Sequence, residues 1–252
     1  MKQNYPEVIH TTDIHEILKD PSIGAIVIAT PINSHFSIAK KALESKKHVF
    51  VEKPLTKTVV EAQKLIKIAK KNRRCLFAGH VFLYNEVFKK IKALHKTESI
   101  KYINFEWKKL GTFDEDIFEN LLSHDLSLNL ELFGMPKKIK LISKYSLLTQ
   151  VDRFSLELYF NKNIKSEITI DRTAHYKKKT VMIMTQTNSY IWDDNELFKF
   201  NKKTESYKKI FQSKNTPLYL ECKEFIRNIN AKNYSIDSAI LAEKIASLIS
   251  KI

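Results

Sequence analysis

The first third of the chain consists of short apolar runs separated by segments with helical spacing. The runs are Ile23–Thr30, His48–Pro54 and Cys75–Leu83. Continuous, β-branched runs of this length are typical of strands that are buried on both faces of a sheet. Apolar residues recur at helical spacing over Ser34–Ser45 and Thr58–Lys71, and Asp13 is a suitable N-cap for a short helix over Asp13–Asp20. This order predicts a parallel sheet with right-handed βαβ crossovers.

Beyond residue 85 the spacing of apolar residues changes to a period of two, as in the segments YINFEWKKL and FSLELYF. Such alternation is typical of antiparallel strands with one buried and one solvated face. We expect strands over 138–148, 153–160, 164–172 and 179–192. Helices are expected over 86–95, 114–133, 217–230 and 237–251, and the second of these should end at Gly134 and Pro136. The pattern therefore predicts a second domain with a large, mostly antiparallel sheet.

Length and composition limit the class of protein. With 252 residues, 43% of them hydrophobic, the chain is long enough for one large domain or two smaller ones. No apolar run is long enough to span a membrane, and the first residues lack the apolar segment of a secretory signal, so we expect a cytoplasmic protein with no membrane partner. Cys75 and Cys222 are far apart and show no metal-like spacing, so neither a disulfide framework nor a zinc site is expected.

The formal net charge of +15 is compatible with a nucleic-acid partner, because a basic surface attracts phosphates with little sequence preference. The positive residues, however, are mostly lysines scattered along amphipathic segments. No basic block alternates with aromatic residues as a single-strand binding platform would require. We interpret the lysines as a solvated surface and expect no nucleic-acid partner.

Polar residues follow each of the three predicted parallel strands. They are Thr30–His35, then Glu52–Pro54, then Gly79–His80 with Tyr84 and Asn85 downstream. Ligands of parallel α/β sheets bind beyond the carboxyl ends of the strands, so these segments are the first candidates for a binding site. Taken singly, each has an ordinary explanation, since a proline can end a strand, a lysine can lie on the surface and a histidine can be buried in the core. Their joint order and spacing are more specific.

Several segments occur in an order that resembles the glucose-fructose oxidoreductase, inositol dehydrogenase and MocA (Gfo/Idh/MocA) family. They are ATP with a histidine four residues after the proline, EKP, AGH, SHDLSLNLELFG, IWDD and PLYLECKEFIRNI. The resemblance implies an α/β plus α+β fold. A truncated, NAD(P)-binding Rossmann-like domain would occupy residues 1–85, and a substrate and oligomerisation domain residues 86–252, with the C-terminal helix returning to the first domain. It also implies NAD or NADP as cofactor and hydride transfer between nicotinamide and a sugar, polyol or nucleotide-sugar hydroxyl.

The resemblance implies roles for individual residues. The catalytic candidates are Lys53, which matches the EKP lysine between nicotinamide and substrate, and His124, which would take the proton of the hydroxyl being oxidised. The implied cofactor-binding residues are Thr30, Pro31, Asn33, His35 and Glu52, and the implied substrate-binding residues are His80, Tyr84, Asn85 and Asn120. No metal is implied.

One departure from the family pattern concerns the residue four positions before the active-site histidine. The family usually has an aspartate there, whereas this chain has Asn120. An amide can position a group but cannot relay a proton. Asp125 follows His124 directly, but adjacent residues of a helix point about 100° apart, so we expect Asp125 to be a poor substitute.

A second departure is the lack of a GxGxxG loop, which holds the cofactor's pyrophosphate at a helix N-terminus. The chain has only four glycines, and no two of them are close enough to form this fingerprint. By resemblance, the first strand, the glycine turn and the helix that follows are absent from this chain. We expect the edge of the parallel sheet to be exposed where that strand would pair.

Three hypotheses of function stay open. The chain is an NAD(P)-dependent sugar dehydrogenase, a catalytically inactive remnant that serves as a binding or oligomerisation module, or half of a split enzyme whose N-terminal βαβ fragment is a separate polypeptide. Lys53 and His124 favour the enzyme, whereas Asn120 and the missing loop favour the remnant. We also expect a homo-oligomer, since the open face of a large antiparallel sheet suits contacts between copies. The sequence does not specify the substrate or the choice between NAD and NADP.

Overall fold

The computed structural model describes residues 8–252, which divide into two compact units. The first unit runs to Gly79 and also includes Arg227–Ile240, and the second comprises His80–Ile226 and Leu241–Ile252. The two compact units meet in sequence between Gly79 and His80. The predicted functional boundary after residue 85, between a cofactor domain and a substrate domain, stays a prediction. Residues 1–7 of the predicted first domain lie outside the described part of the chain.

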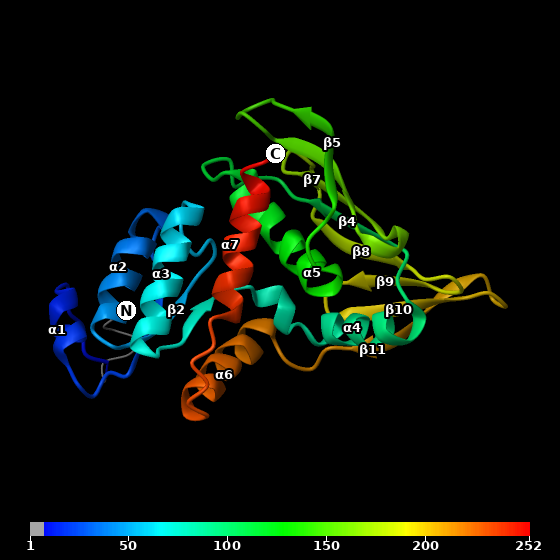
Figure 1. The fold of residues 1–252 in the computed structure, drawn as a ribbon. Helices are drawn as coiled ribbons and strands as arrows, with labels where there is room; N and C mark the ends of the chain where they lie inside the picture. Colours follow the sequence, from blue (N-terminus) through cyan, green and yellow to red (C-terminus); the bar gives the residue numbers. More distant parts are fainter. Residues whose placement is uncertain (1–7) are drawn as a thin grey trace. The chain divides into compact units, whose positions relative to one another are not determined.

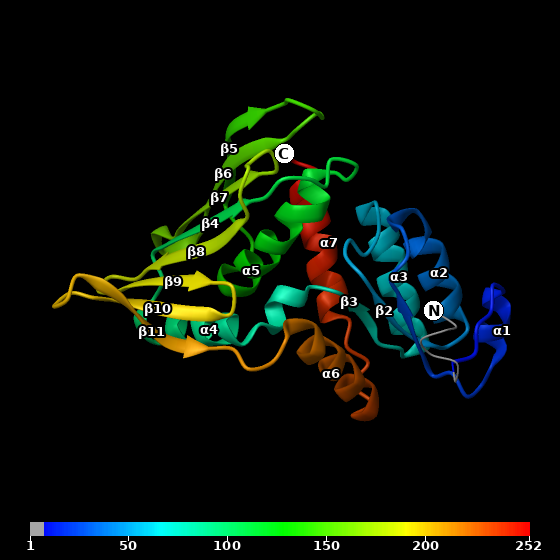
Figure 2. The ribbon, with the colours of Figure 1, turned by 180° about the vertical axis from the view of Figure 1, so that it is seen from behind.

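The first unit contains a three-stranded parallel sheet in the order β1-β2-β3. Its strands are β1 (Ala25–Ile28), β2 (His48–Val51) and β3 (Leu76–Ala78), and its helices are α1 (Ile14–Lys19), α2 (Ile32–Glu44) and α3 (Val59–Asn72). Helices α2 and α3 contact each other and lie side by side (Figures 1 and 2). The predicted alternation of strand and helix is therefore confirmed.

Local capping interactions explain where two of these helices begin. The side chain of Asp13 accepts a hydrogen bond from the backbone N–H of His15 at the start of α1, as the sequence predicts. At the start of α3, Thr58 and Glu61 form a capping box, in which each side chain accepts a hydrogen bond from the other residue's backbone N–H. These contacts satisfy amide groups that have no partner within the helix.

Strand β1 lies at one edge of the parallel sheet. Within residues 8–252 it pairs with β2 alone, and the side chain of Val27 is 64% exposed. An apolar, solvent-exposed edge strand is a ready surface for pairing with a further strand.

The third parallel strand is shorter than predicted. Instead of continuing to Leu83, β3 ends at Ala78, and Val81–Tyr84 form a 3₁₀ helix, η1. Apolar periodicity does not distinguish these cases, because a short buried helical turn and a strand end have the same composition. The 3₁₀ helix leads into α4 (Glu86–Glu98), whose N-cap is Asn85.

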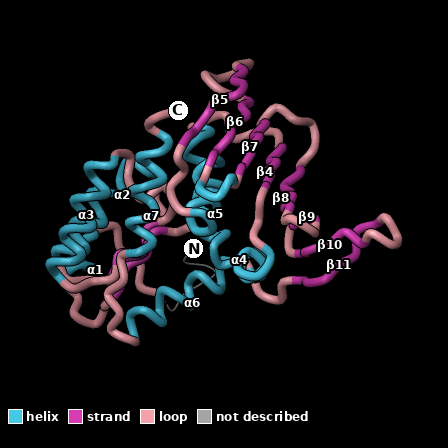
Figure 3. Tube along the Cα trace, turned by 45° about the vertical axis from the view of Figure 1, so that its right-hand side comes forward, coloured by secondary structure: helices cyan, strands magenta, loops and turns pink. Residues whose placement is uncertain are grey.

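The second unit is built on an eight-stranded sheet in the order β11-β10-β9-β8-β4-β7-β6-β5 (Figure 3). The strands are β4 (Tyr102–Lys108), β5 (Lys138–Tyr145), β6 (Arg153–Tyr159), β7 (Lys165–Asp171), β8 (Lys178–Met184), β9 (Ser189–Asp193), β10 (Glu196–Asn201) and β11 (Ser206–Gln212). All neighbouring strands are antiparallel except β4 and β7, which are parallel. The predicted fold class, a small parallel sheet followed by a large and mostly antiparallel one, is confirmed.

One face of the large sheet is buried under helices, and the other is charged. Figures 1 and 2 show α4 and α5 (Ser123–Phe133) on the same face of the sheet. Alternate residues of the strands turn to the core, for example Phe154, Leu156 and Leu158 of β6. The remaining helices are α6 (Pro217–Asn230) and α7 (Asp237–Ile249), as predicted. Among residues 8–252, no helix combines the length and apolar character that crossing a membrane requires.

Two sequence predictions about the second unit are wrong, and two of its strands were not predicted. The single strand expected over 179–192 is two strands, β8 and β9, which form a hairpin with a turn at Thr185–Asn188. Strands β10 and β11 were not predicted. The helix expected to begin at Asp114 begins instead with a π-helical turn, η2 (Phe118–Leu122), which is capped by the carboxylate of Asp116 and continues into α5.

Candidate active site

In the first unit, the loops after β1 and β2 are tied together by a buried histidine. One ring nitrogen of His35 lies 2.7 Å from the carbonyl oxygen of Thr30 and the other 2.8 Å from that of Pro54. His35 is 2% exposed, whereas Thr30, Pro31 and Asn33 are exposed at the carboxyl end of β1. These contacts favour a role for His35 in holding the loops, and its predicted role in cofactor binding stays untested.

Glu52 and Lys53 follow β2 directly, and Gly79 follows β3. A Cβ atom at Gly79 would lie 3.1 Å from Glu52 Oε2 and 3.3 Å from the ring of Phe50. The absence of a side chain at Gly79 thus allows the Glu52 carboxylate to lie against the end of β3. Lys53 is half-buried. The carboxyl ends of the parallel strands therefore carry an exposed polar loop, a carboxylate and a lysine, as the sequence predicts for this edge.

In the second unit, His124 lies in the first turn of α5, directly after the π-helical turn. Its ring is 8% exposed and contacts two aromatic rings, with centroid separations of 4.8 Å to Phe82 and 5.7 Å to Trp107. Phe82 comes from η1 and Trp107 from β4. Three elements thus fix the position of the imidazole, and π-helical turns often occur at functional sites.

A lysine from the sheet contacts the same two rings. Lys179 Nζ lies 3.0 Å from the centroid of Phe82 and 3.8 Å from that of Trp107, as expected for a cation–π interaction. Lys179 on β8 is the register partner of Trp107 on β4, so the two side chains share a face of the sheet.

A buried carboxyl group lies near this lysine. Asp125 is 1% exposed, and within the described residues its Oδ2 atom has no hydrogen-bond partner. Burial raises the pKa of the Asp125 carboxyl to about 7, while the positive charge of Lys179 acts in the opposite direction. The surroundings of His124 therefore contain a charged lysine and a carboxyl group that changes protonation near neutral pH.

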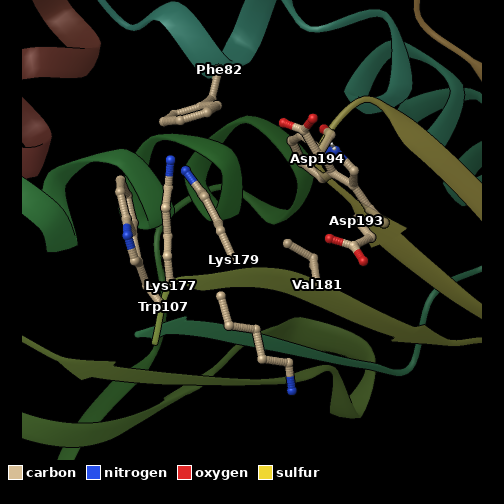
Figure 4. A pocket seen from close by; sticks show the side chains of 9 residues that line it. Phe82, Trp107, Lys177, Lys179, Val181, Asp193 and Asp194 are labelled. Atoms are coloured by element: carbon tan, nitrogen blue, oxygen red, sulfur yellow. Dashed lines mark hydrogen bonds between the residues drawn. The ribbon is translucent and has the colours of Figure 1, made fainter. Parts of the chain in front are cut away.

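A cavity of about 480 Å³ adjoins these rings (Figure 4). It is lined by Phe82, Trp107, Lys177, Lys178, Lys179, Val181, Trp192, Asp193 and Asp194. Figure 4 shows Lys177 and Lys179 pointing into the cavity towards Phe82, with Trp107 on one side and the two aspartates on the other. Its volume lies within the range of small-molecule sites, and its lining combines three aromatic side chains with five charged ones.

The predicted substrate residues of the second unit lie near its start or near His124. His80 is buried directly before η1, and Tyr84 is half-buried at the end of η1. The side-chain oxygen of Asn85 accepts a hydrogen bond of 2.7 Å from Val87 N, so this oxygen caps α4. Asn120 lies within the π-helical turn. Contact of these residues with a substrate stays a prediction.

The sequence analysis missed Phe82, Trp107 and Lys179 as parts of this site. Trp107 and Lys179 have a signal in the pattern, because both extend the inward-facing alternation of their strands, after Phe105 in β4 and before Val181 in β8. Phe82 has no such signal, because the apolar pattern predicts a strand where the structure has the 3₁₀ helix η1. Lys53 belongs to the first unit and His124 to the second, and the hypothesis that they act together stays a prediction.

Comparison with known proteins shows what the sequence and the fold of this chain are similar to. Residues 3–80 match the family model GFO_IDH_MocA, described as an oxidoreductase family with an NAD-binding Rossmann fold. The chain is 31% identical over 150 residues to the uncharacterized oxidoreductase YdgJ of Escherichia coli, which covers 54% of this chain and 43% of the relative. It is 29% identical over 181 residues to the scyllo-inositol 2-dehydrogenase (NADP(+)) IolW of Bacillus subtilis, covering 64% of this chain and 50% of the relative. These matches span about half the length of the relatives.

Solved structures show the same fold over nearly all of the chain. The UDP-N-acetylglucosamine 3-dehydrogenase of Acidithiobacillus ferrooxidans superposes with a TM-score of 0.89 at 20% identity, covering 99% of this chain and 84% of that one. The resemblance to the Gfo/Idh/MocA family of oxidoreductases that the sequence segments indicate is thus confirmed for the first unit by the family model, and the solved structures show the fold. The match of residues 3–80 to a family with an NAD-binding Rossmann fold implies NAD or NADP as cofactor by resemblance.

Proposed function

We propose that the protein is an NAD(P)-dependent oxidoreductase that transfers a hydride between nicotinamide and a hydroxyl-bearing carbon of a sugar, polyol or nucleotide sugar. The observation that carries this proposal is the buried His124 ring, held by Phe82 and Trp107 beside a cavity of small-molecule size. Relatives that are named dehydrogenases of scyllo-inositol and of UDP-N-acetylglucosamine support this range of substrates.

In this proposal His124 accepts the proton of the substrate hydroxyl. A histidine suits this step because its ordinary pKa lies close to neutral pH. The two aromatic contacts restrict the ring to one orientation, which places its nitrogen atoms before the substrate arrives. Lys53, at the end of β2, is proposed as the second catalytic residue, which would orient the reacting oxygen.

The residues present fit one end of the cofactor. At the carboxyl ends of β1 and β2, the exposed side chains of Thr30 and Asn33 and the Glu52 carboxylate, with Gly79 giving it room, suit the hydroxyl groups of a ribose. The sequence has no glycine-rich loop for the pyrophosphate. When bound, NAD(P) supplies the carbon that accepts the hydride. A homo-oligomer and a separate N-terminal βαβ fragment remain parts of the proposal.

The first test is cofactor binding by the purified chain. NAD(H) or NADP(H) that binds the folded state should raise its melting temperature and change the fluorescence of the reduced cofactor. We expect the Lys53→Met and Glu52→Gln variants to weaken this binding, and the exposed Lys57→Met variant to leave it unchanged.

Turnover with a panel of sugars and polyols then tests the role of His124. We expect His124→Gln to lower kcat by about 100-fold or more, the usual contribution of a positioned general base, with little change in cofactor binding. His175→Gln, at an exposed histidine of the same unit, is the matched control. A chain that binds neither cofactor, even with a GxGxxG-bearing βαβ segment added, would refute the enzyme and favour the inactive module.

A further inference from the structure

Lys179 occupies a position at which the strand pattern calls for an apolar residue. In β8, the inward-facing residues Val181 and Ile183 are 3% and 1% exposed. Lys179 is the next residue on the same face, since side chains alternate along a strand. Its ammonium group lies against the rings of Phe82 and Trp107 rather than in open solvent. The carboxyl group of Asp125 also acts on this ammonium group electrostatically.

Lys177 adds a second positive charge to the same side. It is two residues before Lys179, and both side chains point into the cavity (Figure 4). Within residues 8–252 no salt bridge to Lys177 is formed, although like charges two residues apart on one face repel each other. The residue between them behaves differently, because Lys178 Nζ lies 2.5 Å from Glu106 Oε2 on the other face of the sheet.

We propose that Lys177 and Lys179 form an anion-binding site in this cavity, so that the substrate of the proposed function carries a carboxylate or phosphate group. The anion site itself is argued from the cavity, and only the claim that the bound anion belongs to a substrate rests on the proposed function. Lysine ammonium groups bind both kinds of anion through charge-assisted hydrogen bonds.

The rest of the cavity indicates what the anion is attached to. Asp193 and Asp194 lie on the side away from Trp107 (Figure 4), and carboxylates accept hydrogen bonds from hydroxyl groups. Flat aromatic walls suit the apolar face of a sugar ring. A polyhydroxylated molecule with one anionic end matches this separation of positive and negative groups.

Binding in the absence of cofactor tests the proposal without turnover. Both tryptophans of the chain, Trp107 and Trp192, line the cavity, so intrinsic fluorescence reports its occupation. The probes are glucose 6-phosphate, glucuronate, and neutral glucose as the uncharged reference. We expect one or both anionic probes to bind at least about tenfold more tightly than glucose, as for one charge-assisted hydrogen bond, and more weakly as salt is raised. The tighter of the two anionic probes identifies the group as phosphate or carboxylate.

Three variants assign the effect to the two lysines. The Lys177→Met change, at an exposed position, and the Lys177→Met/Lys179→Met double change should each weaken anion binding, the double change by about tenfold or more. Lys144→Met removes the same charge from an exposed position of the same unit that does not line the cavity, and should leave binding unchanged. The Lys177→Met variant keeps the test valid even where the double variant does not fold.

Several outcomes would overturn the anion site. They are equal affinity for glucose and the anionic probes, no saturable binding of an anionic probe at concentrations up to the order of 10 mM, or equal losses in Lys177→Met and Lys144→Met. These outcomes are distinct from failure of the proposed function. A chain that binds the anions but never reduces NAD(P) refutes the enzyme and leaves the site, whereas turnover of neutral sugars alone refutes the site and leaves the enzyme.

Discussion

The buried carboxyl group of Asp125 should make the second unit less stable as pH rises. Asp125 is 1% exposed, and burial is the largest cause of its raised pKa, about 7. The native state therefore holds this proton more tightly than the unfolded chain does. The free energy of unfolding should fall from about pH 4 to about pH 7 and then show no further change from this group. The Asp125→Asn change removes the titration while keeping the shape of the protonated acid.

The size of the effect follows from the two pKa values. With about 3.9 in the unfolded chain and about 7 in the native state, ionisation of Asp125 lowers the free energy of unfolding by about 4 kcal/mol in total. About 2.5 kcal/mol of this falls between about pH 5 and about pH 8. The attraction of Lys179 is already included in the native value, since it is one of the causes of the shift. We therefore expect the free energy of unfolding of Asp125→Asn, relative to that of the wild type, to rise by about 2.5 kcal/mol from about pH 5 to about pH 8.

Urea unfolding at a series of pH values measures this difference. Tryptophan fluorescence is the suitable signal, because both tryptophans belong to the second unit. Comparing the variant with the wild type at each pH cancels titrations that both proteins share. Asp114→Asn, at an exposed aspartate of the same unit, should show no such change. A difference between variant and wild type that stays constant within about 0.5 kcal/mol from about pH 5 to about pH 8 would refute the reasoning.

Three further changes test the packing that supports the site. Arg172→Met removes the buried ion pair with Asp152, 3.1 Å from Arg172 Nε, and the hydrogen bonds of the guanidinium group to the carbonyl oxygens of Thr112, Glu115 and Val151; urea unfolding should show a loss of about 3–5 kcal/mol, and a loss below about 1 kcal/mol would contradict it. Gly79→Ala places a methyl group 3.1 Å from Glu52 Oε2, and thermal unfolding should show a destabilisation of about 1–3 kcal/mol, with no change as the contrary result. Thr58→Ala removes one half of the capping box of α3 and should cost about 1 kcal/mol in urea, whereas Thr58→Ser should recover most of it.

Much of the fold could be predicted because its elements carry strong local signals. The parallel strands are continuous apolar runs, and α6 and α7 match their predicted ranges closely. The wrong predictions concern segments whose composition does not distinguish one type of secondary structure from another. Residues 81–84 are apolar whether they extend a strand or form the 3₁₀ helix η1, and only tertiary packing selects the helix. The β8–β9 hairpin was missed because its turn, Thr185–Asn188, contains neither glycine nor proline.

The site divides in the same way between local and long-range information. His124 could be found because it occurs in a recognisable segment, and the polar ends of β1 and β2 follow from the position of each strand. The contacts of His124 with Phe82 and Trp107 join residues more than 15 positions apart in sequence, and no local pattern specifies such pairs. The π-helical turn before His124 also has no local signature, since its residues suit an ordinary helix.

Lys179 interrupts the pattern of apolar residues on the inward face of β8. The alternation of β8 continues inward from Ile183 to Val181 and then to Lys179, where a charged group takes the place of an apolar one. From the sequence alone, the lysine indicates the end of the buried strand, because charged side chains are usually exposed to solvent. The register with Trp107 shows that the inward face continues, so the lysine is an exception within the core face. Local sequence rules are most often broken at functional sites, so we expect the Lys177→Met/Lys179→Met double change to alter which ligands bind in the cavity.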